Sequence, residues 1–138
     1  GTTSATATPR GMDVELELQL PPEPGSVSLA RRRIAESLDG ALEPERLEDL
    51  ILIVSELLTN SVLHAGLSTG DLVRVSLAVR GGTVRGEVRD PGGGFVPPEE
   101  PGPRADLGGG WGLRVVDGLC DRWGVNGVGE TRVWFELR

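Results

Sequence analysis

Three polar side chains recur at intervals of four residues in a stretch that is otherwise apolar. Glu56, Asn60 and His64 lie within the segment PERLEDLILIVSELLTNSVLHA, and on a helix this spacing places them in a single stripe. Apolar residues flank the stripe: Leu52, Ile53 and Leu63. The segment is therefore apolar nearly all round, which predicts a helix covered on several sides. A carboxylate and an amide buried in that setting are costly unless something pairs with them.

Two interpretations of this stripe are open. In the first, Glu56 and Asn60 pair internally with the backbone or with other side chains. In the second, they form the polar floor of a ligand cavity. There the Asn60 carbonyl could coordinate a cation such as Mg²⁺, which prefers oxygen ligands, and Glu56 could act as a base. His64 is ambiguous by itself, because a histidine near a helix C-terminus also stabilises the helix dipole or binds a carbonyl.

A glycine-rich cluster, Asp90-Pro91-Gly92-Gly93-Gly94, directly follows a predicted strand. Glycine permits positive φ angles and lets a ligand approach the backbone closely. The Asp90 carboxylate is an acceptor suited to an exocyclic amine, such as that of adenine.

A second cluster, GGGWGLR at residues 108–114, precedes a predicted helix. Free backbone amides and the helix dipole at such a position suit phosphate oxygens. The cluster is not a Walker A loop, since no Gly-Lys-Ser/Thr follows it. It also differs from the dinucleotide-binding fingerprint, which opens the first helix after a strand. Neither glycine cluster by itself identifies a nucleotide-binding site.

Hydrophobic periodicity predicts the elements that must position these residues. They are strands over 14–20, 71–80, 83–90, 121–125 and 131–137, and helices over 26–39, 44–66 and 113–120. Ser26 is the predicted N-cap of the first helix, and Gly81-Gly82 and Asn126-Gly127 are the predicted turns. This order predicts an α+β fold, a two-layer α/β sandwich with one sheet and helices on one face.

Two tryptophans and one run of arginines have simple structural interpretations. Trp123 and Trp134 are predicted to belong to the core. The run Arg31–Arg33 is predicted to form a solvated surface of the first helix.

Composition narrows the classes of function. The 138 residues predict one domain over 12–138, preceded by a disordered tail over 1–11. The net charge of -7 argues against a protein that binds a nucleic-acid backbone, and no apolar run is long enough to span a membrane. All 14 basic residues are arginine, so no lysine can contact a phosphate. The single cysteine, Cys120, excludes an intramolecular disulfide and favours a reducing, cytoplasmic setting.

The stripe, the two glycine clusters and Thr131 before the last strand occur in one order along the chain. Together they resemble the histidine-kinase-like ATPase superfamily, which includes gyrase, heat-shock chaperones, sensor kinases and mismatch-repair ATPases. The resemblance covers about residues 12–138. It implies the Bergerat ATP-binding fold, with a mixed, mostly antiparallel sheet and with ATP held between the helices and a glycine-rich lid.

This resemblance also implies roles for individual residues. Asn60 would bind Mg²⁺, Asp90 would bind the adenine amine, and Thr131 would approach the adenine. Glu56 would accept the proton of an incoming hydroxyl, and His64 would complete the cofactor-binding motif on the helix without being a phosphoacceptor. Glycines 92 and 94 would shape the adenine pocket. The phosphates would lie beside a further group of residues: Gly108, Gly110, Gly112, Leu113 and Arg114.

Within the superfamily, the short chain most resembles the anti-sigma-factor serine kinases of bacteria. Those proteins bind a sigma factor and phosphorylate a serine on a small antagonist protein. The resemblance therefore implies ATP and Mg²⁺ as cofactors and proteins as partners, with a homodimer as one option. Two alternatives stay open: a non-catalytic binder whose partner affinity depends on the nucleotide, and the catalytic domain of a larger histidine kinase.

Overall fold

The computed structural model describes residues 13–64, 67–68, 70–92, 110–126 and 129–138; at residue 64 and over 110–113 it describes the backbone alone. The predicted tail over 1–11 lies outside these ranges. Eight elements follow one another along the chain: β1 (Val14–Leu20), α1 (Pro24–Ser37), α2 (Pro44–His64), β2 (Val73–Arg80), β3 (Thr83–Asp90), α3 (Gly110–Leu119), β4 (Arg122–Asn126) and β5 (Thr131–Leu137). Their order is the one predicted from the sequence.

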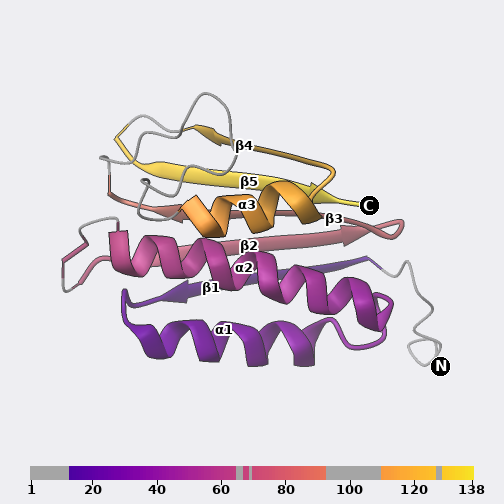
Figure 1. Ribbon diagram of the computed structural model, residues 1–138. Coiled ribbons are helices and arrows are strands. Elements are labelled where there is room, and N and C mark those ends of the chain that lie inside the picture. Colours follow the sequence, from indigo (N-terminus) through magenta and orange to yellow (C-terminus); the bar gives the residue numbers. More distant parts are fainter. Residues whose placement is uncertain (1–12, 65–66, 69, 93–109, 127–128) are drawn as a thin grey trace.

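The five strands form one sheet in the order β1-β2-β3-β5-β4, and every neighbouring pair is antiparallel. β2 and β3 are joined by the predicted turn, where Gly81 and Gly82 have φ angles of 57° and 84° that suit glycine. The three helices lie together on one face of the sheet (Figure 1). The predicted two-layer α+β fold is therefore confirmed.

The core lies between the helices and the sheet. Strand residues alternate in burial, so one aliphatic set from each strand faces the helices, as in β2: Val73, Val75, Leu77 and Val79. The ring of Phe135 packs over Gly86 on the neighbouring strand, where an added Cβ would lie 2.4 Å from Phe135 Cζ. Glycine at this position makes room for the aromatic ring.

Two predicted helix starts are wrong. The first helix begins at Pro24 with Glu23 as its N-cap, so Ser26 lies inside the first turn. Proline fixes the helical φ angle, and the Ser26 hydroxyl instead donates to the carbonyl of Pro21 at 2.6 Å. The last helix begins at Gly110, three residues earlier than predicted, because the glycines of the second cluster continue the helix.

The two tryptophans lie on different sides of the sheet. Trp123 is partly buried against the core, as predicted, and its Nε1 donates to Asp117 at 2.9 Å. The prediction that Trp134 belongs to the core is wrong. Strand alternation places it on the face opposite the helices, where its ring covers Gly124.

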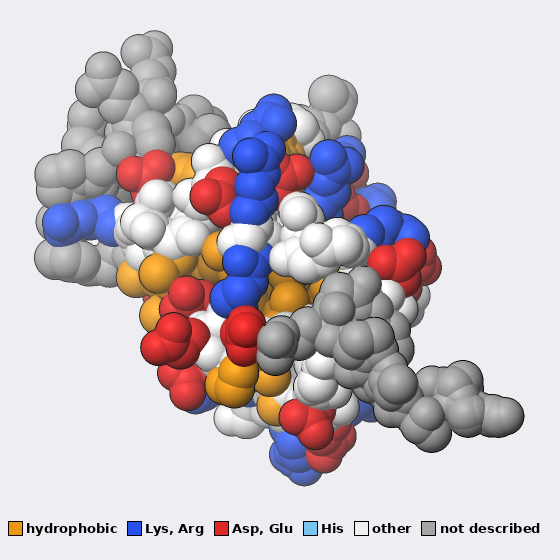
Figure 2. Space-filling view, turned by 90° about the vertical axis from the view of Figure 1, so that its right-hand side faces the viewer, with side chains coloured by type: hydrophobic (Ala, Val, Ile, Leu, Met, Phe, Trp, Pro, Cys, Tyr) orange, Lys and Arg blue, Asp and Glu red, His pale blue; other side chains and the backbone are white. Residues whose placement is uncertain are grey.

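The surface is highly charged and of mixed sign. Over the end of the molecule that carries the β2–β3 turn, arginine side chains adjoin acidic ones and hydrophobic side chains show only in small patches (Figure 2). Arg31, Arg32 and Arg33 are exposed on α1, as predicted. None of the described helices has an apolar stretch long enough to cross a membrane.

Candidate functional site

The polar stripe lies on α2, as the spacing predicts. Glu56 and Asn60 are both half-buried, and His64 is the last residue of the helix. The flanking leucines are more open than the sequence indicates, since Leu52 is 43% exposed and Leu63 62% exposed. The prediction that α2 is covered on several sides is confirmed, although these two leucines stay accessible. The helix packs on α1, α3 and the sheet, and the stripe borders the side that these neighbours leave accessible.

Asp90 is the buried polar centre of the site. It ends β3 and is only 4% exposed. Its Oδ2 accepts a hydrogen bond from the Ser61 hydroxyl at 2.7 Å, and its Oδ1 accepts one from the Gly92 amide at 2.8 Å. Burial raises the pKa of this carboxyl above its ordinary value, because desolvation outweighs the two hydrogen bonds that stabilise the charged form.

Thr131 closes this network from a third element. It begins β5 directly opposite Asp90 in the sheet register, and its hydroxyl donates to the Gly92 carbonyl at 2.7 Å. Consecutive hydrogen bonds therefore join Asp90, Gly92 and Thr131 to Ser61 of α2, and the bond from Thr131 to Gly92 spans 39 positions of the chain. The chain folds so that one end of the sheet and the last turn of α2 hold the same carboxylate.

Ser61 is the residue of this network that sequence reasoning missed. It is 7% exposed and adjoins Asn60, but it lies 100° further round the helix, on the side of the sheet. The signal was present as a polar residue beside Asn60 in an apolar helix. The four-residue spacing of the stripe does not include Ser61, so the stripe does not predict this contact.

The two other hydroxyls near Glu56 are occupied within α2. Ser55 donates to the Ile51 carbonyl at 2.6 Å, and Thr59 donates to the Ser55 carbonyl at 2.7 Å. These bonds to the preceding turn are a common way for such side chains to be satisfied in a helix. Ser61 differs, since its bond leaves the helix and reaches the sheet.

The predicted phosphate-binding residues are placed only in part. Gly110, Gly112 and Leu113 form the first turn of α3, which packs beside α2, and Arg114 is exposed on the same helix. Gly94 and Gly108 lie outside the described residues. Of the predicted site residues, hydrogen bonds join Asp90 and Gly92 to each other and Gly92 to Thr131.

A metal ion would find few protein ligands here. No group of three histidine, cysteine or acidic side chains among the described residues could hold one. The stripe offers two oxygen donors, the Glu56 carboxylate and the Asn60 amide, which are half-buried and one turn apart. A single amide oxygen suits Mg²⁺, which is often held by one or two protein oxygens together with phosphates and waters.

Residues 20–137 match the family model of the histidine kinase-like ATPase domain. The chain belongs to this family. Because this family is one of ATPase domains, membership implies that the chain binds ATP. No match is found among curated proteins.

Solved structures share the fold of this histidine kinase-like ATPase domain. The RsbU and RsbW domains of Rv1364c from Mycobacterium tuberculosis have a TM-score of 0.70 and 22% identity, over 90% of this chain and 32% of that one. The blue-light activated histidine kinase EL346 of Erythrobacter litoralis has a TM-score of 0.58 and 23% identity, over 83% of this chain and 41% of that one. A structure of the histidine kinase domain of EL346 has a TM-score of 0.54 and 24% identity, over 85% of this chain and 60% of that one. This chain therefore spans less than two thirds of each of these structures.

Proposed function

We propose that this chain is an ATP-dependent protein-serine kinase of the anti-sigma-factor type, which phosphorylates a small antagonist protein. Family membership supports the nucleotide. The likeness to a structure that contains an RsbW domain supports the regulatory branch over the sensor kinases, since that TM-score of 0.70 exceeds the 0.58 and 0.54 of the histidine kinase structures. On this proposal the chain acts in the cytoplasm as a single domain over 12–138.

The buried Asp90 is the observation that carries the proposal. An ionised carboxylate offers about four acceptor positions, and Ser61 and Gly92 use one on each oxygen. The acceptor positions that remain would bind the exocyclic amine of adenine. Because Ser61 and the sheet fix the carboxylate from two sides, it would meet the base without a further loss of side-chain freedom.

The phosphates would lie toward the N-terminus of α3. Its first-turn amides, with Arg114 and the glycines at 94, 108, 110 and 112, would take the place of the lysine that the chain lacks. Asn60 would hold Mg²⁺, which when bound offsets the negative charge of the phosphates. His64 lies one turn after Asn60, at the C-terminal end of α2, and would complete this cofactor-binding motif.

Glu56 would serve as the base. It lies one turn before Asn60 on α2 and is half-buried. As the serine oxygen of the antagonist forms its bond to the γ-phosphorus, the bond from that phosphorus to the β,γ-bridging oxygen breaks and ADP leaves. The hydroxyl proton passes to the Glu56 carboxylate.

Calorimetric titration with a non-hydrolysable ATP analogue, with and without Mg²⁺, tests the nucleotide site. Asp90→Asn is expected to weaken binding about 10- to 100-fold, the value of one hydrogen bond to a charged group. Asn60→Ala should remove the dependence on Mg²⁺. Ser61→Ala should weaken binding while Ser55→Ala, which removes a hydroxyl bonded within α2, should not. Equal affinity of all variants and wild type would contradict the site.

Glu56→Gln separates the kinase from the non-catalytic alternative. It should abolish transfer of labelled phosphate from ATP to proteins of a host-cell extract and leave affinity for the analogue unchanged. Transfer that persists in this variant contradicts the role of Glu56. If wild type binds ATP but transfers no phosphate, the chain is a nucleotide-gated binder instead.

A further inference from the structure

The outer side of α2, turned away from the sheet, carries two exposed leucines. Leu52 is 43% exposed and Leu63 is 62% exposed, whereas every other leucine, isoleucine and valine of the helix is buried or half-buried. On an ideal helix, side chains eleven residues apart lie about 20° from one another round the axis. The two leucines therefore share the side of α2 that α1, α3 and the sheet leave accessible (Figure 1).

The proposed base lies between these two leucines. Glu56 follows Leu52 by one turn and precedes Leu63 by two, at about 40° and 20° from them round the axis. It is half-buried, so a group from outside the chain reaches its carboxylate from the same accessible side. Single exposed leucines are ordinary on a protein surface. Two that flank a proposed catalytic carboxylate are positioned to contact the protein that carries the reacting hydroxyl.

The same side of α2 is acidic. Glu48 is exposed, and since it lies beyond the first turn, the helix dipole does not account for it. In the part of the chain that the structure describes, neither Glu48 nor Glu56 forms an ion pair. The one arginine of α2 is turned toward the sheet, where Nη2 of Arg46 donates to the carbonyls of Gly82 at 2.9 Å and Leu137 at 3.1 Å. A partner that complements this side is therefore basic as well as apolar.

We call Glu48, Leu52, Glu56 and Leu63 the outer strip. We propose that the outer strip selects the substrate of the kinase, an extended segment of a partner protein that is basic and apolar and carries the target serine. This inference rests on the proposed function, because the serine hydroxyl lies at Glu56. One apolar side chain of the segment then packs on Leu52 and another on Leu63, and a basic side chain pairs with Glu48.

The spacing of the outer strip sets the spacing of the segment. Along the helix axis, Glu48 lies about 12 Å and Leu52 about 6 Å before Glu56, and Leu63 lies about 10 Å after it. At about 3.3 Å per residue of an extended segment, a basic residue falls about four positions and an apolar residue about two positions to one side of the serine. A second apolar residue falls about three or four positions to the other side. Positions two and four from the serine lie on the same side of an extended chain as the serine itself, so all three face α2.

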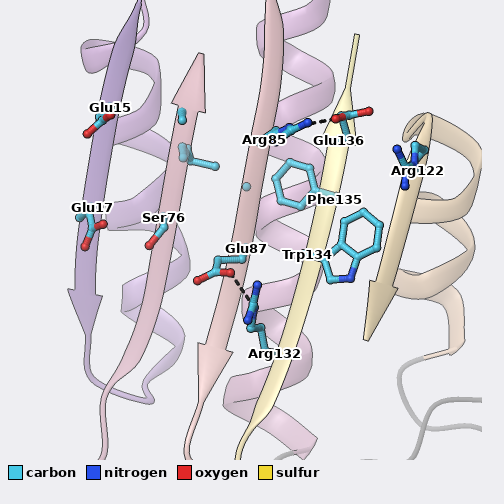
Figure 3. Close-up of a pocket in the computed structure, with 13 residues that line it drawn as sticks. Glu15, Glu17, Ser76, Arg85, Glu87, Arg122, Arg132, Trp134, Phe135 and Glu136 are labelled. Atoms are coloured by element: carbon cyan, nitrogen blue, oxygen red, sulfur yellow. Dashed lines mark hydrogen bonds and ion pairs between the residues drawn. The ribbon is translucent and has the colours of Figure 1, made fainter. Parts of the chain in front are cut away.

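The chain offers a matched control for each part of the outer strip. Leu72, which precedes β2, is 40% exposed, close to the 43% of Leu52. Glu17 of β1 is exposed like Glu48 and forms no ion pair among the described residues, but it lies on the face of the sheet opposite the helices (Figure 3). Alanine at Leu72 and arginine at Glu17 therefore change the same types of side chain outside the outer strip.

Transfer of labelled phosphate from ATP to synthetic peptides, catalysed by the whole chain, tests the inference. The parent peptide is Arg-Ala-Leu-Ala-Ser-Ala-Ala-Leu-Leu, made also in the reverse order because the outer strip does not fix the direction of the segment. For the better of the two, the wild-type kcat/KM should exceed that of two altered peptides by at least about tenfold. One altered peptide has glutamate in place of the arginine, and the other has alanine in place of every leucine.

Variants of the outer strip should remove these preferences one at a time. Leu52→Ala and Leu63→Ala should each raise KM for the better peptide about five- to tenfold, with little change in kcat, because they remove binding surface and leave the base. Glu48→Arg should make the glutamate peptide the better substrate. Leu72→Ala and Glu17→Arg should match wild type with every peptide. Affinity for the ATP analogue should be unchanged in every variant, which shows that each one folds.

Phosphate transfer to proteins of a host-cell extract separates failure of this inference from failure of the proposed function. If wild type phosphorylates extract proteins but neither peptide, or if Leu52→Ala and Leu63→Ala use the peptide as well as wild type does, the outer strip does not select the substrate. The kinase function then still stands. If wild type transfers phosphate to neither extract nor peptide, the proposed function fails and this inference fails with it. A loss in Leu72→Ala equal to that in Leu52→Ala would overturn the inference as well.

Discussion

The two faces of the sheet treat polar groups in opposite ways. On the helix side, aliphatic residues fill the core and a polar group such as Asp90 is buried and held by single, directed hydrogen bonds. On the opposite face, glutamates pair with arginines. The carboxylate of Glu136 is buried, at 6% exposed, but it is paired with Arg85, and Glu87 is paired with Arg132. A buried carboxylate with no paired cation is costly, and such groups are candidates for functional sites. A carboxylate that is paired with an arginine costs less, because the cation offsets its charge.

The largest expected difference in unfolding free energy is between alanine variants of two adjacent aromatic residues on β5. Phe135 is 1% exposed and Trp134 is half-exposed on the other face. Phe135→Ala should lower the free energy of unfolding by about 3–5 kcal/mol, through lost burial and a cavity. Trp134→Ala should lower it by about 1 kcal/mol, since part of the ring stays in water. Urea unfolding at low protein concentration measures both, and similar losses would contradict the assignment of faces.

Two glycines lie against these rings, Gly86 against Phe135 and Gly124 against Trp134, and alanine at each should have a different cost in stability. Gly86→Ala would place a Cβ 2.4 Å from Phe135 Cζ and 2.7 Å from Leu77 Cδ2 in the packed core. A cost of about 1–3 kcal/mol in unfolding free energy is expected, as for other overpacked cores. Gly124→Ala would meet the Trp134 ring at 2.8 Å, but that ring can swing into solvent. Gly124→Ala should therefore lower the unfolding free energy less than Gly86→Ala does. A larger loss for Gly124→Ala in urea unfolding would contradict this.

The smallest expected effect is a pH dependence of opposite sign on the two faces. The folded-state pKa of Asp90 lies above its ordinary 3.8, chiefly through burial, so its contribution to stability is full below pH 3.8 and is lost as the pH rises through the raised value. The pKa of Glu136 lies below its ordinary 4.5, chiefly through the hydrogen bond from Arg85. Its contribution is present above pH 4.5 and is lost as the pH falls through the lowered value.

Unfolding free energies measured across acidic pH should therefore separate two variants. Relative to wild type, Asp90→Asn should gain stability as the pH rises, because it never carries the buried charge. Glu136→Gln should lose stability over the same change. Parallel pH profiles of the two variants would show that the two carboxylates do not differ as the structure indicates.

Local pattern was sufficient for the elements and for their order. β3 and β5 were predicted residue for residue, because turn residues and alternation define their ends. Helix ends were less accurate. Pro24 and the Ser26 bond to Pro21 decide the start of α1, and this depends on how the chain enters the helix from β1. Sequence also predicted Glu56, Asn60, Asp90 and Thr131 as site residues, through the order of the motifs and their resemblance to a family.

What the sequence could determine by itself was therefore periodic or local: which residues alternate, which share a helix stripe, and where glycine and proline interrupt them. Only the tertiary structure decided that Ser61 reaches Asp90 across 29 positions, and that Trp134 lies on the face of the sheet away from the helices. Strand alternation defines two faces without saying which one the helices will cover. That choice depends on the burial summed over all five strands, which no single segment of the sequence contains.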